Sequence, residues 1–134
     1  MRKTATVFAS ISGCIAVIFG ALGAHGLSKM DIKPESLHAY ETAVQYQLLH
    51  SIAMLAIIAL HTRVTAYFKT IMNLLIVGIL LFSGSIYILV LGDLLKINTT
   101  WVGPVTPVGG LSLIAAWFIL FLSALKYNDS SSSS

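Results

Sequence analysis

The chain has 134 residues, of which 57% are hydrophobic and 10% are charged, and its mean hydropathy is +0.89. A soluble domain carries about 25% charged residues, so this composition excludes a water-soluble globular enzyme. It also excludes a disordered chain, because disorder requires low hydrophobicity. The net charge of +3 is small and spread along the chain, which argues against a nucleic-acid-binding surface of clustered basic residues. The class that remains is an integral membrane protein.

Four apolar stretches, at 4–27, 40–60, 70–91 and 107–125, predict four transmembrane helices. Each is close to the ~20 residues that cross a hydrocarbon core. Each should be helical, because a backbone in lipid has to satisfy its own hydrogen bonds. Short connections predict one all-α domain over residues 1–129, arranged as an up-down-up-down four-helix bundle. Residues 130–134 form a polar serine tail for which we expect no structure.

Small residues share one face of the first helix. They are Ala9, Gly13, Ala16, Gly20 and Ala24. Small residues let helices approach closely in lipid, so we expect this face to pack within the bundle, with a homo-oligomer seam as the alternative. The first apolar stretch, at 4–27, could instead be a signal peptide cleaved near Gly23, or a lipoprotein signal ending at Cys14. The hydrophobicity continues past the cysteine, which favours an uncleaved helix.

Polar residues gather toward one end of the expected bundle, where they favour an internal hydrogen-bond network, with a small polar site open to the outer surface as the alternative. They are His25, His38, Glu41, Gln45, Tyr87 and Thr106. At about 100° per residue, His38, Glu41 and Gln45 share one face of the second helix. Polar groups at membrane depth are costly and often functional. In the internal network, Glu41 is expected to be satisfied by His25 or by groups of the fourth helix.

Three further polar residues have secondary roles in this interpretation. Tyr46 and His50 occupy another face of the second helix, and we expect His50 to be a hydrogen-bonded packing residue. Asn73, near the inner end of the third helix, is expected to bond between helices. The pair His38-x-x-Glu41 is too weak a pattern to predict a metal site. We expect no metal and no cofactor, and the absence of known catalytic motifs predicts a protein that is not an enzyme.

Helix starts and orientation can also be predicted. Pro34 is expected at the start of the second helix, and Thr106-Pro107 is expected to be the N-cap and first residue of the fourth. Basic residues favour one side of the membrane by five to three: Arg2, Lys3, Arg63, Lys69 and Lys126 against Lys29, Lys33 and Lys96. The positive-inside rule therefore predicts cytoplasmic termini.

Four ordered motifs carry a resemblance to a known family. They are FGALGAHGL at 19–27, ETAVQYQLLH at 41–50, GILLFSGSIY at 78–87 and GPVTPVGG at 103–110. Together they resemble the small bacterial membrane proteins catalogued as domain of unknown function 423, which have small mitochondrial transmembrane relatives. The resemblance covers about residues 8–125. It implies a four-helix membrane protein with no assigned reaction, and an uncleaved first helix.

These observations predict a multi-pass, non-enzymatic protein of the bacterial cytoplasmic membrane that supports membrane or envelope integrity. Its partners would be membrane lipids, other membrane proteins or further copies of itself, and no nucleic acid is expected. One alternative is a small oligomeric transporter or channel that uses the polar residues of the second helix. Another is an intramembrane enzyme, or a haem or quinone partner, using His25 or His50.

Overall fold

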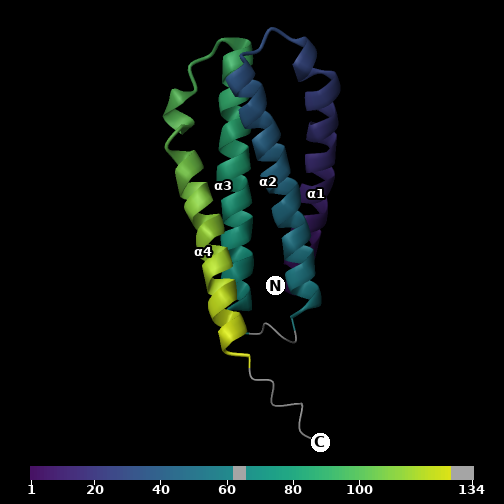
Figure 1. Ribbon diagram of the computed structural model, residues 1–134, viewed down its shortest axis with the longest axis vertical. Coiled ribbons are helices and arrows are strands. Elements are labelled where there is room, and N and C mark those ends of the chain that lie inside the picture. Colours follow the sequence, from purple (N-terminus) through teal and green to yellow (C-terminus); the bar gives the residue numbers. More distant parts are fainter. Residues whose placement is uncertain (62–65, 128–134) are drawn as a thin grey trace, which may run out of the picture.

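The computed structural model describes residues 1–61 and 66–127, most of which lie in four long helices (Figure 1). The long helices are α1 (Arg2–His25), α2 (Pro34–Ala59), α3 (Phe68–Leu95) and α4 (Val105–Leu125). The 3-10 helices η1 (Leu27–Lys29) and η2 (Thr100–Val102) lie in the α1–α2 and α3–α4 connections. Each long helix is long and apolar enough to cross a membrane. Arg63 and the predicted serine tail at 130–134 lie outside the described residues.

The helices run alternately up and down, so the predicted all-α, up-down-up-down bundle is confirmed (Figure 1). Both connections that contain η1 and η2 lie at the same end of the bundle, which we call the η end. The principal packing is between α1 and α2, α2 and α3, and α3 and α4. α2 and α3 are therefore central, and α1 and α4 take the outer places.

Two buried clusters hold the helices together. The larger draws on all four helices and includes Ala5, Met54, Leu75 and Ala116. The smaller lies toward the η end, around Tyr40, Ala43, Ile86 and Val90. Large apolar side chains also cover the outside of the bundle, as expected for a surface that faces lipid tails.

The backbones of α3 and α4 approach each other closely at a glycine. A Cβ built on Gly109 would lie 2.3 Å from the backbone nitrogen of Phe82, so no larger residue fits without moving a helix. In α1, Ala9 and Ala16 are buried, and Gly13 and Gly20 lie against Ser51 and Val44 of α2. Ala24, the last of the five small residues, is exposed. Most of the small-residue face of α1 is thus turned toward α2.

The predicted helix starts had different outcomes. Pro34 occupies the first position of α2, as predicted. α4 begins at Val105 with Pro104 at its N-cap, so the prediction of Thr106 as the N-cap was wrong. The Thr106 hydroxyl lies 2.6 Å from that of Ser85 on α3, so it bonds across helices and makes no side-chain cap.

Candidate functional site

A hydrogen-bonded network joins α1, α2 and α3 inside the bundle. The Gln47 side chain is its centre: Nε2 donates to the carbonyl oxygen of Ser12 at 3.0 Å, and Oε1 accepts from the Tyr87 hydroxyl at 2.7 Å. Ser51 donates to the Gln47 carbonyl at 2.7 Å, and its hydroxyl lies 2.9 Å from that of Ser12. Both oxygen and nitrogen of the Gln47 amide are therefore used in linking three helices.

Sequence reasoning predicted Tyr87 but missed Gln47, Ser12 and Ser51. A signal was available, because Ser12 lies four residues before Ala16 and so shares the small-residue face of α1. Ser51 follows Gln47 by one helical turn on α2. Polar residues repeated at that spacing opposite a small-residue face indicate interhelical bonding.

His50 lies between α2 and α4 with both ring nitrogens engaged. Nε1 of Trp117 donates to Nε2 of His50 at 3.2 Å, and Nδ1 of His50 lies 2.7 Å from the carbonyl oxygen of Tyr46. An indole N–H donates only, so Nε2 must be the acceptor and Nδ1 must carry the proton. The geometry therefore holds His50 as the neutral Nδ1–H tautomer, and a haem iron would have to displace one of these partners to bind it.

The remaining interior polar groups are also paired. Ser83 donates to the carbonyl oxygen of Ala43 at 2.8 Å, which links α3 to α2. Across residues 1–61 and 66–127, no buried side-chain nitrogen or oxygen lacks a hydrogen-bond partner. Buried polar groups that are all satisfied stabilise a bundle.

The structure does not bring the six residues of the predicted polar site together. His25, His38, Glu41 and Gln45 are exposed, while Tyr87 and Thr106 bond separately in the interior. The physical reason is the helical period, which turns the face shared by His38, Glu41 and Gln45 outward. The internal hydrogen-bond network expected around Glu41 is not found among the described residues either, because the Glu41 side chain is exposed. Asn73, expected to bond between helices, is exposed as well.

A lateral groove opens between α2 and α4, with Phe82 of α3 at its floor. Its volume is ≈ 980 Å³. The walls are mostly apolar and include the His50–Trp117 pair, Leu49 and Ile114, with Gln45 toward the η end. Glu41 is one helical turn from Gln45 and His38 is two turns away. These three exposed residues form the α2 polar stripe, of which only Gln45 is part of the groove lining.

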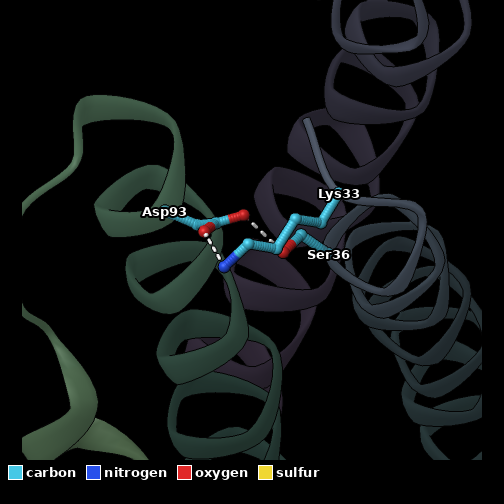
Figure 2. Close-up of polar contacts among 3 residues, drawn as sticks. All are labelled: Lys33, Ser36 and Asp93. Atoms are coloured by element: carbon cyan, nitrogen blue, oxygen red, sulfur yellow. Dashed lines mark hydrogen bonds and ion pairs between the residues drawn. The ribbon is translucent and has the colours of Figure 1, made fainter. Parts of the chain in front are cut away.

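An ion pair joins the start of α2 to the end of α3 at the η end (Figure 2). The Lys33 ammonium lies 3.0 Å from Oδ1 of Asp93, and the Ser36 hydroxyl donates to Oδ2 of Asp93 at 2.7 Å. The hydrogen bond to the Asp93 carboxylate and the attraction of its charge raise the pKa of Lys33. These contacts connect the start of α2 to the end of α3.

The part of the chain that the structure describes contains no group of three or more His, Cys, Asp or Glu side chains that could hold a metal ion. Cys14 is a free, exposed thiol on α1. The features that stand out for ligand chemistry are therefore the α2–α4 groove and the α2 polar stripe.

Comparisons with known proteins place this arrangement in a family. Residues 19–110 match the model of a family described as protein of unknown function (DUF423). The chain is 38% identical to the UPF0382 inner membrane protein YgdD of Escherichia coli, over 90% of this chain and 88% of that protein. It is 32% identical to the UPF0382 membrane protein YwdK of Bacillus subtilis, over 93% of this chain and 98% of that protein.

A membrane protein of Haemophilus influenzae with the same family name is also 32% identical, over 94% of this chain. No solved structure matches the chain. The relatives cover nearly the whole chain and are named as bacterial membrane proteins, in agreement with the four candidate spans. This chain therefore belongs to the DUF423 family of bacterial membrane proteins, whose function is unknown.

Proposed function

We propose that this protein is a non-enzymatic component of the bacterial cytoplasmic membrane that supports membrane integrity through contacts with lipids. One observation carries the proposal: the buried polar side chains of the described residues are all hydrogen-bonded within the bundle, whereas the α2–α4 groove is open to the side. A site that opens laterally, between transmembrane helices, is accessible to lipids. The same openness is compatible with a partner helix from another membrane protein.

The proposal includes an orientation in which both termini are cytoplasmic and the η end faces outward. Among the described residues, Arg2, Lys3, Lys69 and Lys126 lie at the end opposite the η end. This distribution supports the orientation through the positive-inside rule. Fusions of a fluorescent protein, which folds in the cytoplasm, and of alkaline phosphatase, which is active outside it, should report opposite signals at the C-terminus. An active phosphatase fusion there would contradict the orientation.

The experiment for the function is a clean deletion with complementation. We expect the deleted strain to show increased dye permeability and a faster loss of membrane potential under detergent or osmotic stress. The wild-type gene and a Glu35→Gln variant, altered at an exposed acidic residue of the first turn of α2, should restore both properties. Unchanged permeability, potential and stress survival in the deletion strain would refute the proposed function.

A transporter or channel is the second candidate, and one observation favours it. Gln45 and His50 line the same lateral groove, so two copies facing each other could close their grooves into a path with polar groups along it. Flux of ions and small solutes into liposomes containing the purified protein tests this idea. Flux above that of empty liposomes, and lower in a Gln45→Leu variant, would favour the transporter over the lipid-contact function.

A further inference from the structure

We infer that a pocket at the end of the bundle opposite the η end binds an anionic phospholipid, such as phosphatidylglycerol, through its phosphate group. This pocket, the basic pocket, lies between the starts of α1 and α3 and has a volume of ≈ 690 Å³. Its polar lining residues are Arg2, Lys3, His61, Tyr67, Lys69 and Thr70. The inference rests on the proposed contacts with lipids and adds a site with a defined class of lipid, separate from the α2–α4 groove.

The charges of the basic pocket are all of one sign. Arg2, Lys3 and Lys69 are positive, and none of the residues that line the pocket is acidic. The acidic residues that the structure describes belong to the half of the bundle toward the η end: Asp31, Glu35, Glu41 and Asp93. Within residues 1–61 and 66–127, the three positive side chains therefore form no ion pair. Charge complementarity requires an anion as the occupant, and basic pockets between transmembrane helices bind anionic headgroups.

The start of α3 supplies backbone donors to the same pocket. Phe68, Lys69 and Thr70, the first three residues of α3, are all part of the lining. The N-cap residue Tyr67 makes no side-chain cap, and the first turn contains no acidic residue. The first N–H groups of a helix have no partner within the helix and favour a negative charge. A phosphate in the pocket can therefore accept hydrogen bonds from these groups and from the planar guanidinium of Arg2.

Contacts with α4 fix the position of the α3 start. Ser123 of α4 donates to the carbonyl oxygen of Ala66 at 2.6 Å. Lys126 donates to the Tyr67 hydroxyl, and its ammonium lies 4.6 Å from the centre of the Tyr67 ring. Since Tyr67 lines the basic pocket, Lys126 adds a fourth positive charge beside it.

The position of the basic pocket along the bundle suits the phosphate of a lipid. The 28 residues of α3 span about 42 Å, which exceeds a hydrocarbon core of about 30 Å by about 6 Å at each end. Lys69 is the second residue of α3 and lies in the headgroup layer. Deeper in the membrane, Ile11 and Ile15 of α1 and Leu80 of α3 line an apolar crevice of ≈ 210 Å³. Leu80 is about 16 Å from Lys69 along the helix, within reach of an acyl chain.

Asn73 favours a lipid over a free phosphate ion. It follows Lys69 by one helical turn and precedes Leu80 by two, so it shares a face of α3 with a residue of each pocket. Its side chain is exposed and lies about 7 Å beyond the helix start, just inside the hydrocarbon core, where an unsatisfied amide is costly. The ester carbonyl oxygens of a phospholipid can accept hydrogen bonds from this amide, whereas a free phosphate offers no acceptor at that depth.

Native mass spectrometry of the purified protein in detergent can measure the affinity for each lipid. The probes are phosphatidylglycerol and phosphatidylethanolamine with the same acyl chains, and glycerol 3-phosphate, which has the phosphate without the chains. We expect phosphatidylglycerol to bind about tenfold more tightly than zwitterionic phosphatidylethanolamine, because its net charge meets several basic side chains. Glycerol 3-phosphate at the same concentration should not displace the lipid.

Substitutions at the basic pocket test its location. The double variant Arg2→Gln and Lys69→Gln should remove the tenfold preference and leave the affinity for phosphatidylethanolamine unchanged. If this variant does not fold, Lys69→Gln alone should reduce the preference about threefold, and Lys69→Arg should retain it. The matched control is the double variant Lys29→Gln and Lys96→Gln, which removes two positive charges at the η end and should keep the full preference.

Three results would overturn the inference. Equal affinities for the two lipids would mean that the pocket does not select an anionic headgroup. A tenfold preference that persists in the Arg2 and Lys69 variants would place the anionic lipid elsewhere on the protein. Displacement of the lipid by an equal concentration of glycerol 3-phosphate would mean that the pocket binds a soluble anion. Equal affinities leave the proposed function standing, whereas a deletion without phenotype refutes that function even if the preference is measured.

Discussion

At the scale of single residues, two glutamines that lie two positions apart on α2 have side chains in different environments. Gln47 is buried and bonded to α1 and α3, whereas Gln45 is exposed in the lateral groove. Two positions along a helix turn the side chain by about 200°, so only one of the two can face the interior. The polar residue that sequence reasoning selected was the outward one, because helical spacing gives relative angles but does not say which angle is inward.

The hydroxyl of Tyr87 provides a test of the interior network. Tyr87→Phe keeps the ring but leaves Oε1 of Gln47 without its donor, and the lost bond should lower the free energy of unfolding by about 0.5–1.5 kcal/mol. The measurement is unfolding of the purified protein in mixed detergent micelles, followed by circular dichroism. The matched control is Tyr46→Phe, because the Tyr46 ring stacks on His50 while its hydroxyl makes no hydrogen bond in the described region. Equal losses in both variants would contradict the assignment.

At the scale of elements, helix pairs differ in what holds them together. α1 meets α2 through small residues and the Gln47 network, whereas α3 meets α4 through a direct backbone approach at Gly109. The regular spacing of small residues predicts close packing on the first helix. Gly109 follows no such repeat, although it lies in one of the four family motifs. A single glycine at a helix crossing cannot be separated by pattern from a glycine that only caps a helix.

Two glycine substitutions distinguish a glycine at a close helix contact from a glycine with open space beside it. In Gly109→Ala the new methyl group would meet the backbone of Phe82, so we expect a loss of about 1–3 kcal/mol from overpacking. Gly84→Ala places a methyl group where no atom lies within 4 Å, and the higher helix propensity of alanine should add up to about 1 kcal/mol. The two variants can be compared by thermal unfolding in one detergent. A Gly109→Ala protein as stable as wild type would show that α3 and α4 are not in this close contact.

At the scale of the whole molecule, the Lys33–Asp93 pair joins the start of α2 to the end of α3 at the η end. Its contribution should depend on pH in a defined direction. The pKa of Lys33 is raised in the folded protein, so the stabilisation is complete below the ordinary lysine pKa. It is lost as the pH rises through the higher pKa of the folded state. The pair is exposed to solvent on its Lys33 side, so added salt should weaken it as well.

Removing the charge of Lys33 tests how much the ion pair with Asp93 contributes to stability. We expect Lys33→Met to have a slightly lower melting temperature than wild type near neutral pH, and the difference should vanish above the folded-state pKa of Lys33. High salt should reduce the same difference. Lys29→Met, which removes an exposed lysine of η1 from the same connection, serves as the control and should show no such pH dependence. A difference that persists at high pH would show that lost packing, rather than lost charge, lowers the stability.

The sequence by itself determined the compartment, the helix number and the alternating direction of the helices. Lipid cannot hydrogen-bond the backbone, so long apolar stretches with short connections leave few alternatives. Only the tertiary structure decided which polar residues face inward, where α3 touches α4, and that a lateral groove opens between α2 and α4. The reason is that the outside of this bundle is as apolar as its core. The usual contrast between a polar surface and an apolar interior, from which buried faces are predicted in soluble proteins, is therefore missing here.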